Sequence, residues 1–402
     1  MKSRGIDGTL RHIAVVGASD AGTRTIRALR RQGFEDRITL VDAGHDTPPD
    51  LDAEPLPDTT AEALDLTHDS GHTVRLSDGR TLDADGLVIA TGAGAHRPPG
   101  PRGGHPAVFS LRTFEDHAGS GGGEDSENSL ALRTALAAGP RVAVVGAGFT
   151  GCEVASYCRA RGLDVTVVES RAAPLERVLG KDMGHALADL HRDHGTVMTT
   201  GARAVSLRPE GVVTADGTLV PADVVVVAAG PAPRTEWLRG SGLDIADGVL
   251  LDSTCAAVGA SRVVAAGSVA RWFNPLFGAV MRVEDGGDAE PRSDTAEQAG
   301  AAADTLLADG EYPMPFESLP YFRSEQYGTE IQFVGVATGV PHVVVGMLAE
   351  RQFVAVYSDG QLVTGALCVN SPSQLDRYRR MVAARVPTDV VFAPPTMLKS
   401  TV

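Results

Sequence analysis

Residues 141–155 read RVAVVGAGFTGCEVA, and this stretch determines the fold of the middle of the chain. Its short run of β-branched residues indicates a buried strand that ends at Gly146. In the GxGxxG pattern that follows, Gly146 permits a tight turn, Gly148 lets the backbone approach a pyrophosphate and Gly151 lets a helix pack on the strand. The sequence therefore predicts a phosphate-binding loop at the start of a helix, whose N-terminus faces the anion.

A second strand, DVTVVE, follows the predicted helix of residues 150–161 and ends in Glu169, roughly 20 residues after the loop as the motif requires. An acid at this position accepts hydrogen bonds from the adenosine ribose, which favours NADH over NADPH. Arg171 leaves NADPH possible, because a nearby arginine can accommodate the 2′-phosphate. The alternative is a glycine turn without a ligand, and the order of strand, loop, helix and second strand argues against it.

An earlier stretch repeats this plan. HIAVVG (12–17) predicts a buried strand, residues 20–31 predict a helix, and residues 38–41 predict a second strand that leads to Asp42. The loop reads GASDAG, so Ser19 replaces the central glycine. Serine is small enough to allow close approach and to hydrogen-bond nearby. We therefore expect a second phosphate loop here.

The features that close each copy are repeated as well. An SDG turn at 77–79 and an apolar strand at 86–90 close the first copy, and a turn at 212–217 and the strand DVVVVAAG at 223–230 close the second. Two copies of one strand–helix–strand plan predict an α/β fold class with two Rossmann-like dinucleotide-binding domains.

Two further segments differ in composition. Residues 117–129 (HAGSGGGEDSENS) are rich in glycine, serine and acids, and we expect a surface loop. From about residue 319 the chain lacks a glycine-rich phosphate loop, while alternating strands between residues 330 and 369 precede a helix at 373–383. This tail predicts a C-terminal α+β domain.

Composition limits the classes of partner. The 402 residues fit two or three domains, and the net charge of −15 argues against nucleic acid or an anionic membrane as a partner. No apolar run approaches the roughly 20 residues of a spanning helix, and we expect a cytoplasmic protein. The four cysteines form no CxxC pair and are expected to be buried thiols. No metal site is predicted: His191 and His194 have no further ligands at metal spacing, and a solvated helix face is expected there.

Taken together, these motifs resemble the FAD-dependent, NAD(P)H-using ferredoxin, rubredoxin and putidaredoxin reductases, which are two-dinucleotide-binding-domain flavoproteins. Besides the two loops, the resemblance rests on motifs spread over nearly the whole chain: LVIATGAGAHRPPG (87–100), SLRTFED (110–116), VVAAGPAPRTEWL (226–238), VVAAGSVARWFNPLFG (263–278), RVE (282–284), PYFRSEQYG (320–328) and VTGALCVN (363–370).

This resemblance implies the cofactors and their binding residues. It implies that FAD is bound by Gly17, Ala18, Ser19, Ala21, Gly22, Asp42, Ala90, Thr91, Gly92, Arg97, Gly267, Ser268 and Val269. It implies that NADH, with NADPH possible, is bound by Gly146, Gly148, Phe149, Thr150, Gly151, Glu169 and Gly230, with Glu153 as the catalytic acid beyond the loop. It also implies a discontinuous FAD-binding domain (1–112 and 247–318), an NAD(P)-binding domain (113–246) and a C-terminal domain (319–402) that roofs the flavin.

The sequence departs from the family pattern beside the flavin. The family's aspartate that binds the ribityl chain is Ser268, its EHW motif is replaced at residues 284–286 by Glu-Asp-Gly, and a usual tryptophan is Arg323. The family's lysine, which pairs with the glutamate represented here by Glu153, is absent, since residues 3–180 contain no lysine.

Without that lysine, several environments for Glu153 stay open. The acid is then exposed, protonated through burial, or paired with an arginine such as Arg97 or Arg323. The alternative to a functional role for Glu153 is that it is an ordinary acid in the first turn of the helix, stabilised by the helix dipole. The acidic segment 46–58, which replaces the lysine-bearing one, predicts a negative field near the flavin.

Three functions are weighed. The first is an NADH-dependent reductase that passes electrons from FAD to a ferredoxin-like iron–sulfur protein. The second is a divergent flavoenzyme that acts on an organic small-molecule acceptor, and the third is a non-catalytic flavin-binding protein. Disulfide reduction is not expected, because the first predicted helix has no cysteine pair. Monomer and homodimer both stay open.

Overall fold

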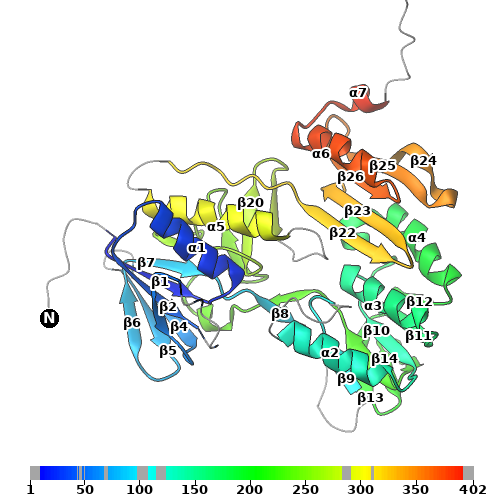
Figure 1. The fold of residues 1–402 in the computed structure, drawn as a ribbon, viewed down its shortest axis with the longest axis horizontal. Helices are drawn as coiled ribbons and strands as arrows, with labels where there is room; N and C mark the ends of the chain where they lie inside the picture. The colour runs from blue at the N-terminus through cyan, green and yellow to red at the C-terminus, as the bar shows by residue number, and fades with distance from the viewer. Residues whose placement is uncertain are drawn as a thin grey trace, which may run out of the picture. The chain divides into compact units, whose positions relative to one another are not determined.

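The computed structural model (Figure 1) describes most of the chain. The described residues are 10–42, 44, 48, 50–67, 71–96, 107–114, 124–282, 291–308 and 312–392. They fall into two compact units. The first contains the described residues of Met1–Gly94, Pro231–Asp285 and Glu290–Ser318, and the second contains those of Ala95–Gly230 and Leu319–Val402.

A parallel five-stranded sheet forms the centre of the first unit. Its strands, in spatial order, are β19 (Val263–Ala265), β7 (Gly86–Ile89), β1 (His12–Val16), β2 (Arg37–Val41) and β3 (Glu54–Leu56). Helices α1 (Asp20–Arg31) and α5 (Pro291–Leu307) pack against each other beside it (Figure 1). Ile13, Leu40 and Leu87 are fully buried, as expected for strands that are covered on both faces.

Smaller elements complete the first unit. An antiparallel meander contains β4 (Ala61–Thr67), β5 (Gly71–Leu76) and β6 (Thr81–Ala84). A second three-stranded sheet contains β18 (Val249–Leu251), β20 (Ala270–Asn274) and β21 (Ala279–Arg282), and the 3₁₀ helix η1 spans Glu236–Leu238. Strands β8 (Ala93–Ala95) and β17 (Pro231–Pro233) pair as a two-stranded sheet.

The second unit contains another parallel five-stranded sheet. Its order is β12 (Val197–Thr200), β11 (Val165–Glu169), β10 (Val142–Val145), β16 (Val224–Val227) and β9 (Ala107–Ser110). An antiparallel meander of β13 (Ala204–Arg208), β14 (Gly211–Thr214) and β15 (Leu219–Pro221) accompanies it, as do α2 (Glu124–Leu136), α3 (Phe149–Ala160) and α4 (Glu176–Asp193). Strand β9 lies inside the sequence range predicted for the FAD-binding domain, yet it pairs with β16 of this sheet.

The C-terminal part of the second unit is an antiparallel sheet. Its order is β22 (Tyr321–Gln326), β23 (Thr329–Gly335), β26 (Val363–Val369), β25 (Gln352–Ser358) and β24 (His342–Met347). The 3₁₀ helices η2 (Leu348–Glu350) and η3 (Pro372–Gln374) and the helices α6 (Leu375–Ala383) and α7 (Thr388–Phe392) complete it. One buried apolar cluster joins this sheet to the second Rossmann sheet and includes Val226, Leu187 and Phe333.

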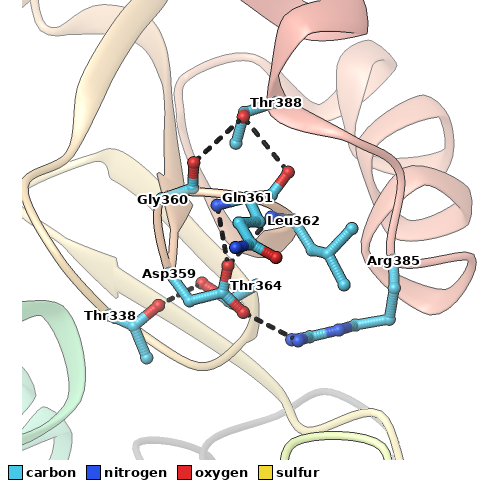
Figure 2. Close-up of polar contacts among 8 residues, drawn as sticks. All are labelled: Thr338, Asp359, Gly360, Gln361, Leu362, Thr364, Arg385 and Thr388. Atoms are coloured by element: carbon cyan, nitrogen blue, oxygen red, sulfur yellow. Dashed lines mark hydrogen bonds and ion pairs between the residues drawn. The ribbon is translucent and has the colours of Figure 1, made fainter.

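Polar contacts fix the end of the C-terminal part to the turn between β25 and β26 (Figure 2). The Asp359 carboxylate accepts hydrogen bonds from the backbone N–H groups of Gln361 and Leu362, and Arg385 donates to it at 2.8 Å. These donors hold the pKa of Asp359 below its usual range. Thr388 Oγ1 donates to the Gln361 carbonyl at 3.1 Å, so both side chains beyond α6 are tied to one turn.

Most predicted elements are confirmed, but the predicted loop at residues 117–129 is wrong in its second half. Helix α2 begins at Glu124, immediately after the glycine run ends. Residues 117–123 of the predicted loop lie outside the described residues. Among the described residues, no helix is long and apolar enough to cross a membrane.

Candidate functional site: two dinucleotide-binding loops

The first site lies at the carboxyl edge of the first sheet. Strands β19, β7, β1 and β2 run parallel, so the segments that follow them meet at one edge. This places together the predicted FAD residues of four separate segments, namely residues 17–22, Asp42, residues 90–92 and residues 267–269. The four segments lie close together because each follows a parallel strand at the same edge of the sheet.

The glycines of the first loop are required by close backbone contacts. Gly17 has φ +107°, and a Cβ there would lie 2.3 Å from the Ala90 carbonyl oxygen. A Cβ at Gly22 would lie 2.0 Å from the Gly17 carbonyl oxygen, so the N-terminus of α1 can approach the loop only without a side chain. Both positions therefore have the roles that the motif predicts.

Ser19 acts as the N-cap of α1. Its hydroxyl donates to the Ala90 carbonyl at 2.8 Å and accepts from the Gly22 N–H at 3.3 Å, which satisfies one of the free donors of the first turn. The Asp42 carboxylate accepts from the N–H of Ala18 at 3.0 Å and from that of Gly44. The serine thus makes the nearby hydrogen bonds that were expected, and Asp42 fixes the loop backbone.

The turn after β19 has little room for side chains. A Cβ at Gly267 would lie 2.8 Å from the Ala21 methyl carbon. Ser268 is 7% exposed, and Val269 is fully buried. Nearby, the Thr91 hydroxyl donates to the Arg234 carbonyl, and the Gly92 carbonyl accepts from the Arg234 N–H.

Gln298 of α5 provides a test of whether the site fits a bound group. It is fully buried, and its Oε1 accepts from the Gly267 N–H at 2.8 Å. Among the described residues its Nε2 finds no hydrogen-bond partner, and a buried amide donor normally has one. An unsatisfied donor next to the Gly267 turn fits a polar group of a bound dinucleotide. Sequence reasoning missed Gln298, which lies in α5, 31 residues after Gly267.

The second loop repeats the first geometry. Gly146 has φ +103°, and its Cβ would lie 2.4 Å from the Ala228 carbonyl oxygen; a Cβ at Gly151 would lie 2.0 Å from the Gly146 carbonyl oxygen. Gly148 is the N-cap of α3 and has no side-chain cap, and a Cβ there would meet no atom within 4 Å. The open space above Gly148 fits a pyrophosphate at the helix N-terminus.

Other predicted residues of this loop use their side chains elsewhere. Thr150 Oγ1 donates to the Arg112 carbonyl at 2.8 Å, and the Phe149 ring stacks on Phe322 of β22. Both side chains therefore contact elements outside the loop. Gly230 follows β16 with φ +90° and has open space around it.

Glu169 performs in the second unit what Asp42 performs in the first. Its Oε2 accepts from the Ala147 N–H at 2.7 Å, and its Oε1 accepts from the Arg171 N–H at 2.7 Å and from the Ser170 hydroxyl. The residue is 9% exposed. In both units an acid at the end of the second strand fixes the residue after the first glycine.

Glu153 is half-buried on α3 and contacts the C-terminal sheet. The Ser324 hydroxyl of β22 donates to its Oε1 at 2.6 Å. The proposed substitute cation, Arg323, forms an ion pair with Glu330 at 3.0 Å instead. Because side chains alternate along β22, Arg323 faces away from the side on which Ser324 meets α3. Arg97 and residues 284–286 lie outside the described residues.

Arginines of α1 and β2 offset part of the charge of the acidic segment. Asp50 and Asp52 pair with Arg27 and Arg30 of α1, and Glu54 of β3 pairs with Arg37 at 2.7 Å. These pairs are exposed, so each contributes little stability, but the arginines compensate the acids. The structure therefore gives little support to the predicted negative field.

Two predictions about ordinary residues have different outcomes. All four cysteines are buried and free, as predicted. The solvated helix face predicted for His191 and His194 is wrong for His191, which is fully buried beneath β22 and hydrogen-bonds to Gln326 and Tyr327. The tail forms a domain surface that covers this face of α4, which a helix pattern alone does not reveal.

Comparison with known proteins agrees with this geometry. The family model described as pyridine nucleotide-disulphide oxidoreductase matches residues 56–303, and a model described as reductase C-terminal matches residues 321–401. The chain is 32% identical to the ferredoxin–NAD(+) reductase component of the anthranilate 1,2-dioxygenase system of Burkholderia cepacia, over 95% of this chain and 97% of that protein. It is 29% identical to putidaredoxin reductase of Pseudomonas putida, over 94% and 93%.

Solved structures give the same result. The reductase in the covalent putidaredoxin reductase–putidaredoxin complex matches with a TM-score of 0.76 and 26% identity, over 94% of both chains. Together with the two loops and the two sheets that hold them, these matches establish the family. The chain belongs to the pyridine nucleotide-disulphide oxidoreductases and carries the C-terminal domain of their ferredoxin-reducing members.

Proposed function

We propose that this protein is an FAD-dependent oxidoreductase that takes hydride from NADH and passes single electrons to a ferredoxin-like iron–sulfur protein. The observation that carries the proposal is the repeated loop: Asp42 holds the Ala18 N–H and Glu169 holds the Ala147 N–H in the same way. Relatives with 29–32% identity over nearly the whole chain are named ferredoxin or putidaredoxin reductases, which supports the acceptor class.

The first loop is the proposed FAD site. Bound FAD supplies the chemistry that accepts a hydride and releases electrons one at a time. The protein contributes the N-terminus of α1 for the pyrophosphate, Asp42 to set the loop backbone, and the unsatisfied Gln298 amide beside the Gly267 turn. Ser268 keeps a hydroxyl where the family has a carboxylate, so it retains one acceptor for the ribityl chain.

The second loop is the proposed NADH site. Gly148 leaves room for the pyrophosphate, and the Glu169 carboxylate lies where the adenosine ribose is expected. A 2′-phosphate placed there would meet that carboxylate, so NADH is the preferred donor. Glu153, further along α3, is the acid that orients the nicotinamide end.

Domain division and location are part of the same proposal. From the sequence we divide the chain into an FAD-binding domain (1–112 and 247–318), an NAD(P)-binding domain (113–246) and a C-terminal domain (319–402). Strand β9, inside the first range, pairs with the sheet of the NAD(P)-binding domain and is assigned to that domain. The match of a separate family model to residues 321–401 supports the last boundary. A cytoplasmic location is supported by four buried, unpaired thiols, since disulfides are rare in that compartment.

The test is anaerobic mixing of the FAD-loaded protein with NADH. Rapid bleaching of the yellow flavin, followed by reduction of an added [2Fe–2S] ferredoxin, is the expected result. If the flavin is bleached but no ferredoxin tested is reduced, and an organic acceptor is turned over instead, the acceptor is an organic molecule and not an iron–sulfur protein. Protein that binds no FAD on titration would contradict the proposal altogether.

A further inference from the structure

A chain of hydrogen bonds reaches Glu153 from inside the C-terminal sheet. Gln326 of β22 donates through Nε2 to the Ser324 hydroxyl at 3.1 Å, and Ser324 donates to Glu153 Oε1 at 2.6 Å. Ser324 is 3% exposed and Gln326 is fully buried. Both side chains lie on the face of β22 that contacts α3, because they are two residues apart on one strand.

The chain continues to α4. His191 Nε2 lies 3.1 Å from Gln326 Oε1, and its Nδ1 lies 3.0 Å from the Tyr327 hydroxyl, which Thr196 Oγ1 contacts at 2.8 Å. Burial lowers the pKa of His191 to about 4, so the ring is neutral at pH 7. Burial also raises the pKa of Tyr327 to about 12, so its hydroxyl keeps its proton.

These protonation states give the chain one direction. A neutral histidine donates through one nitrogen and accepts through the other. With Gln326 Oε1 facing the ring, His191 Nε2–H is the donor and Nδ1 accepts from Tyr327. Each hydrogen bond from Tyr327 to Glu153 then has its donor on the side away from Glu153. His191, Gln326 and Ser324 each accept one hydrogen bond and donate one. Aligned hydrogen bonds polarise one another, and their positive ends here face the carboxylate.

We propose that His191, Gln326 and Ser324 are positioning residues that hold the Glu153 carboxylate in place and stabilise its negative charge through this chain. The inference rests on the proposed function of Glu153 at the nicotinamide end of the second site. It assigns a task to the buried histidine of α4 that neither phosphate loop requires.

The first measurement does not depend on cofactor or activity. In protein labelled with ¹⁵N-histidine, long-range ¹⁵N–¹H spectra report which ring nitrogen carries the proton. The His191 signals are assigned by their loss in His191→Gln. The expected result is a neutral ring protonated at Nε2 from pH 7 to pH 5.5. A ring protonated at Nδ1, or one that is doubly protonated at pH 5.5, would overturn the direction of the chain.

The second measurement separates positioning from mere structural support. Ser324→Ala removes the link to Glu153. The control Ser156→Ala removes a hydrogen bond between α3 and the residue that follows β22, since Ser156 Oγ accepts from the Tyr327 backbone N–H at 2.7 Å. Loss of one hydrogen bond to a charged group corresponds to about a tenfold change in a rate or an equilibrium constant. The limiting rate of flavin reduction by NADH should therefore fall about tenfold in Ser324→Ala, with the half-saturating NADH concentration changed less than about threefold.

Two further variants distinguish a positioning role of Ser324 from a purely structural one. Ser324→Thr, which keeps the hydroxyl, should restore most of the rate, and Ser156→Ala should stay within about twofold of the parent. Equal losses in Ser156→Ala and Ser324→Ala, or no loss in Ser324→Ala, would overturn the proposal. If the parent protein is not reduced by NADH at all, the proposed function fails, while the histidine spectra still decide whether the chain has the stated direction.

Discussion

The two glycines at the start of α3 should fail in different ways when each is changed to alanine. Gly148 has φ −74° and ψ −173°, which any residue adopts, and its Cβ would meet no atom within 4 Å. A Cβ at Gly151 would lie 2.0 Å from the Gly146 carbonyl oxygen, and real Cβ atoms essentially never come closer than 3.0 Å. In Gly151→Ala the helix must therefore move by about 1 Å.

These geometries set the magnitudes. Overpacking of this kind costs about 1–3 kcal/mol, so Gly151→Ala should lower the free energy of unfolding by that amount. Gly148→Ala should change stability by less than about 0.5 kcal/mol, since the added methyl contacts nothing in the protein. The same methyl lies in the space assigned to the pyrophosphate, and NADH affinity should fall at least about tenfold, or roughly 1.4 kcal/mol.

The assay combines denaturant unfolding with NADH titration of each variant. FAD content is the internal control, because the FAD loop at residues 17–22 belongs to the other compact unit. Gly148→Ala should keep its flavin and its unfolding midpoint while it loses NADH affinity. Unchanged NADH affinity in Gly148→Ala would refute the assignment of the second loop to the dinucleotide. A large loss of stability in that variant would refute the inference that a methyl group at position 148 meets no protein atom.

Two further predictions concern charge. NADH should reduce the flavin about thirtyfold more efficiently than NADPH. The 2′-phosphate of NADPH cannot form the ribose hydrogen bond to Glu169 and is repelled by its carboxylate, and the two effects together cost about 2 kcal/mol. Equal efficiency at matched concentrations would contradict this prediction. His191 binds a proton less readily when folded, with a pKa of about 4 against 6.5 unfolded, so stability should fall as the pH drops from about 6.5 to about 4, by on the order of 3 kcal/mol. Unfolding midpoints of the parent and His191→Gln between pH 7 and pH 4.5 measure this, and parallel curves would show that His191 does not contribute.

Local sequence determined the fold class and both loops. A β-branched run that ends in glycine leaves few alternatives to a buried strand and tight turn, and the structure requires glycine at positions 17, 22, 146 and 151 because backbone oxygens occupy the Cβ positions. The helix of residues 20–31 was predicted with the bounds that the structure shows, since Ser19 caps one end. These features depend on neighbours in the chain, and a sequence displays them directly.

The tertiary structure decided which residues meet across long separations. Glu153 and Ser324 are 171 residues apart, and His191 and Gln326 are 135 apart, so no local pattern links them. The alternation of β22 then placed Ser324 against α3 and turned Arg323 toward Glu330, although both belong to one recognisable motif. Which face of a strand is covered depends on the element packed against it, and that information lies outside the strand. For this reason the loops could be predicted from sequence, whereas the surroundings of Glu153 could not.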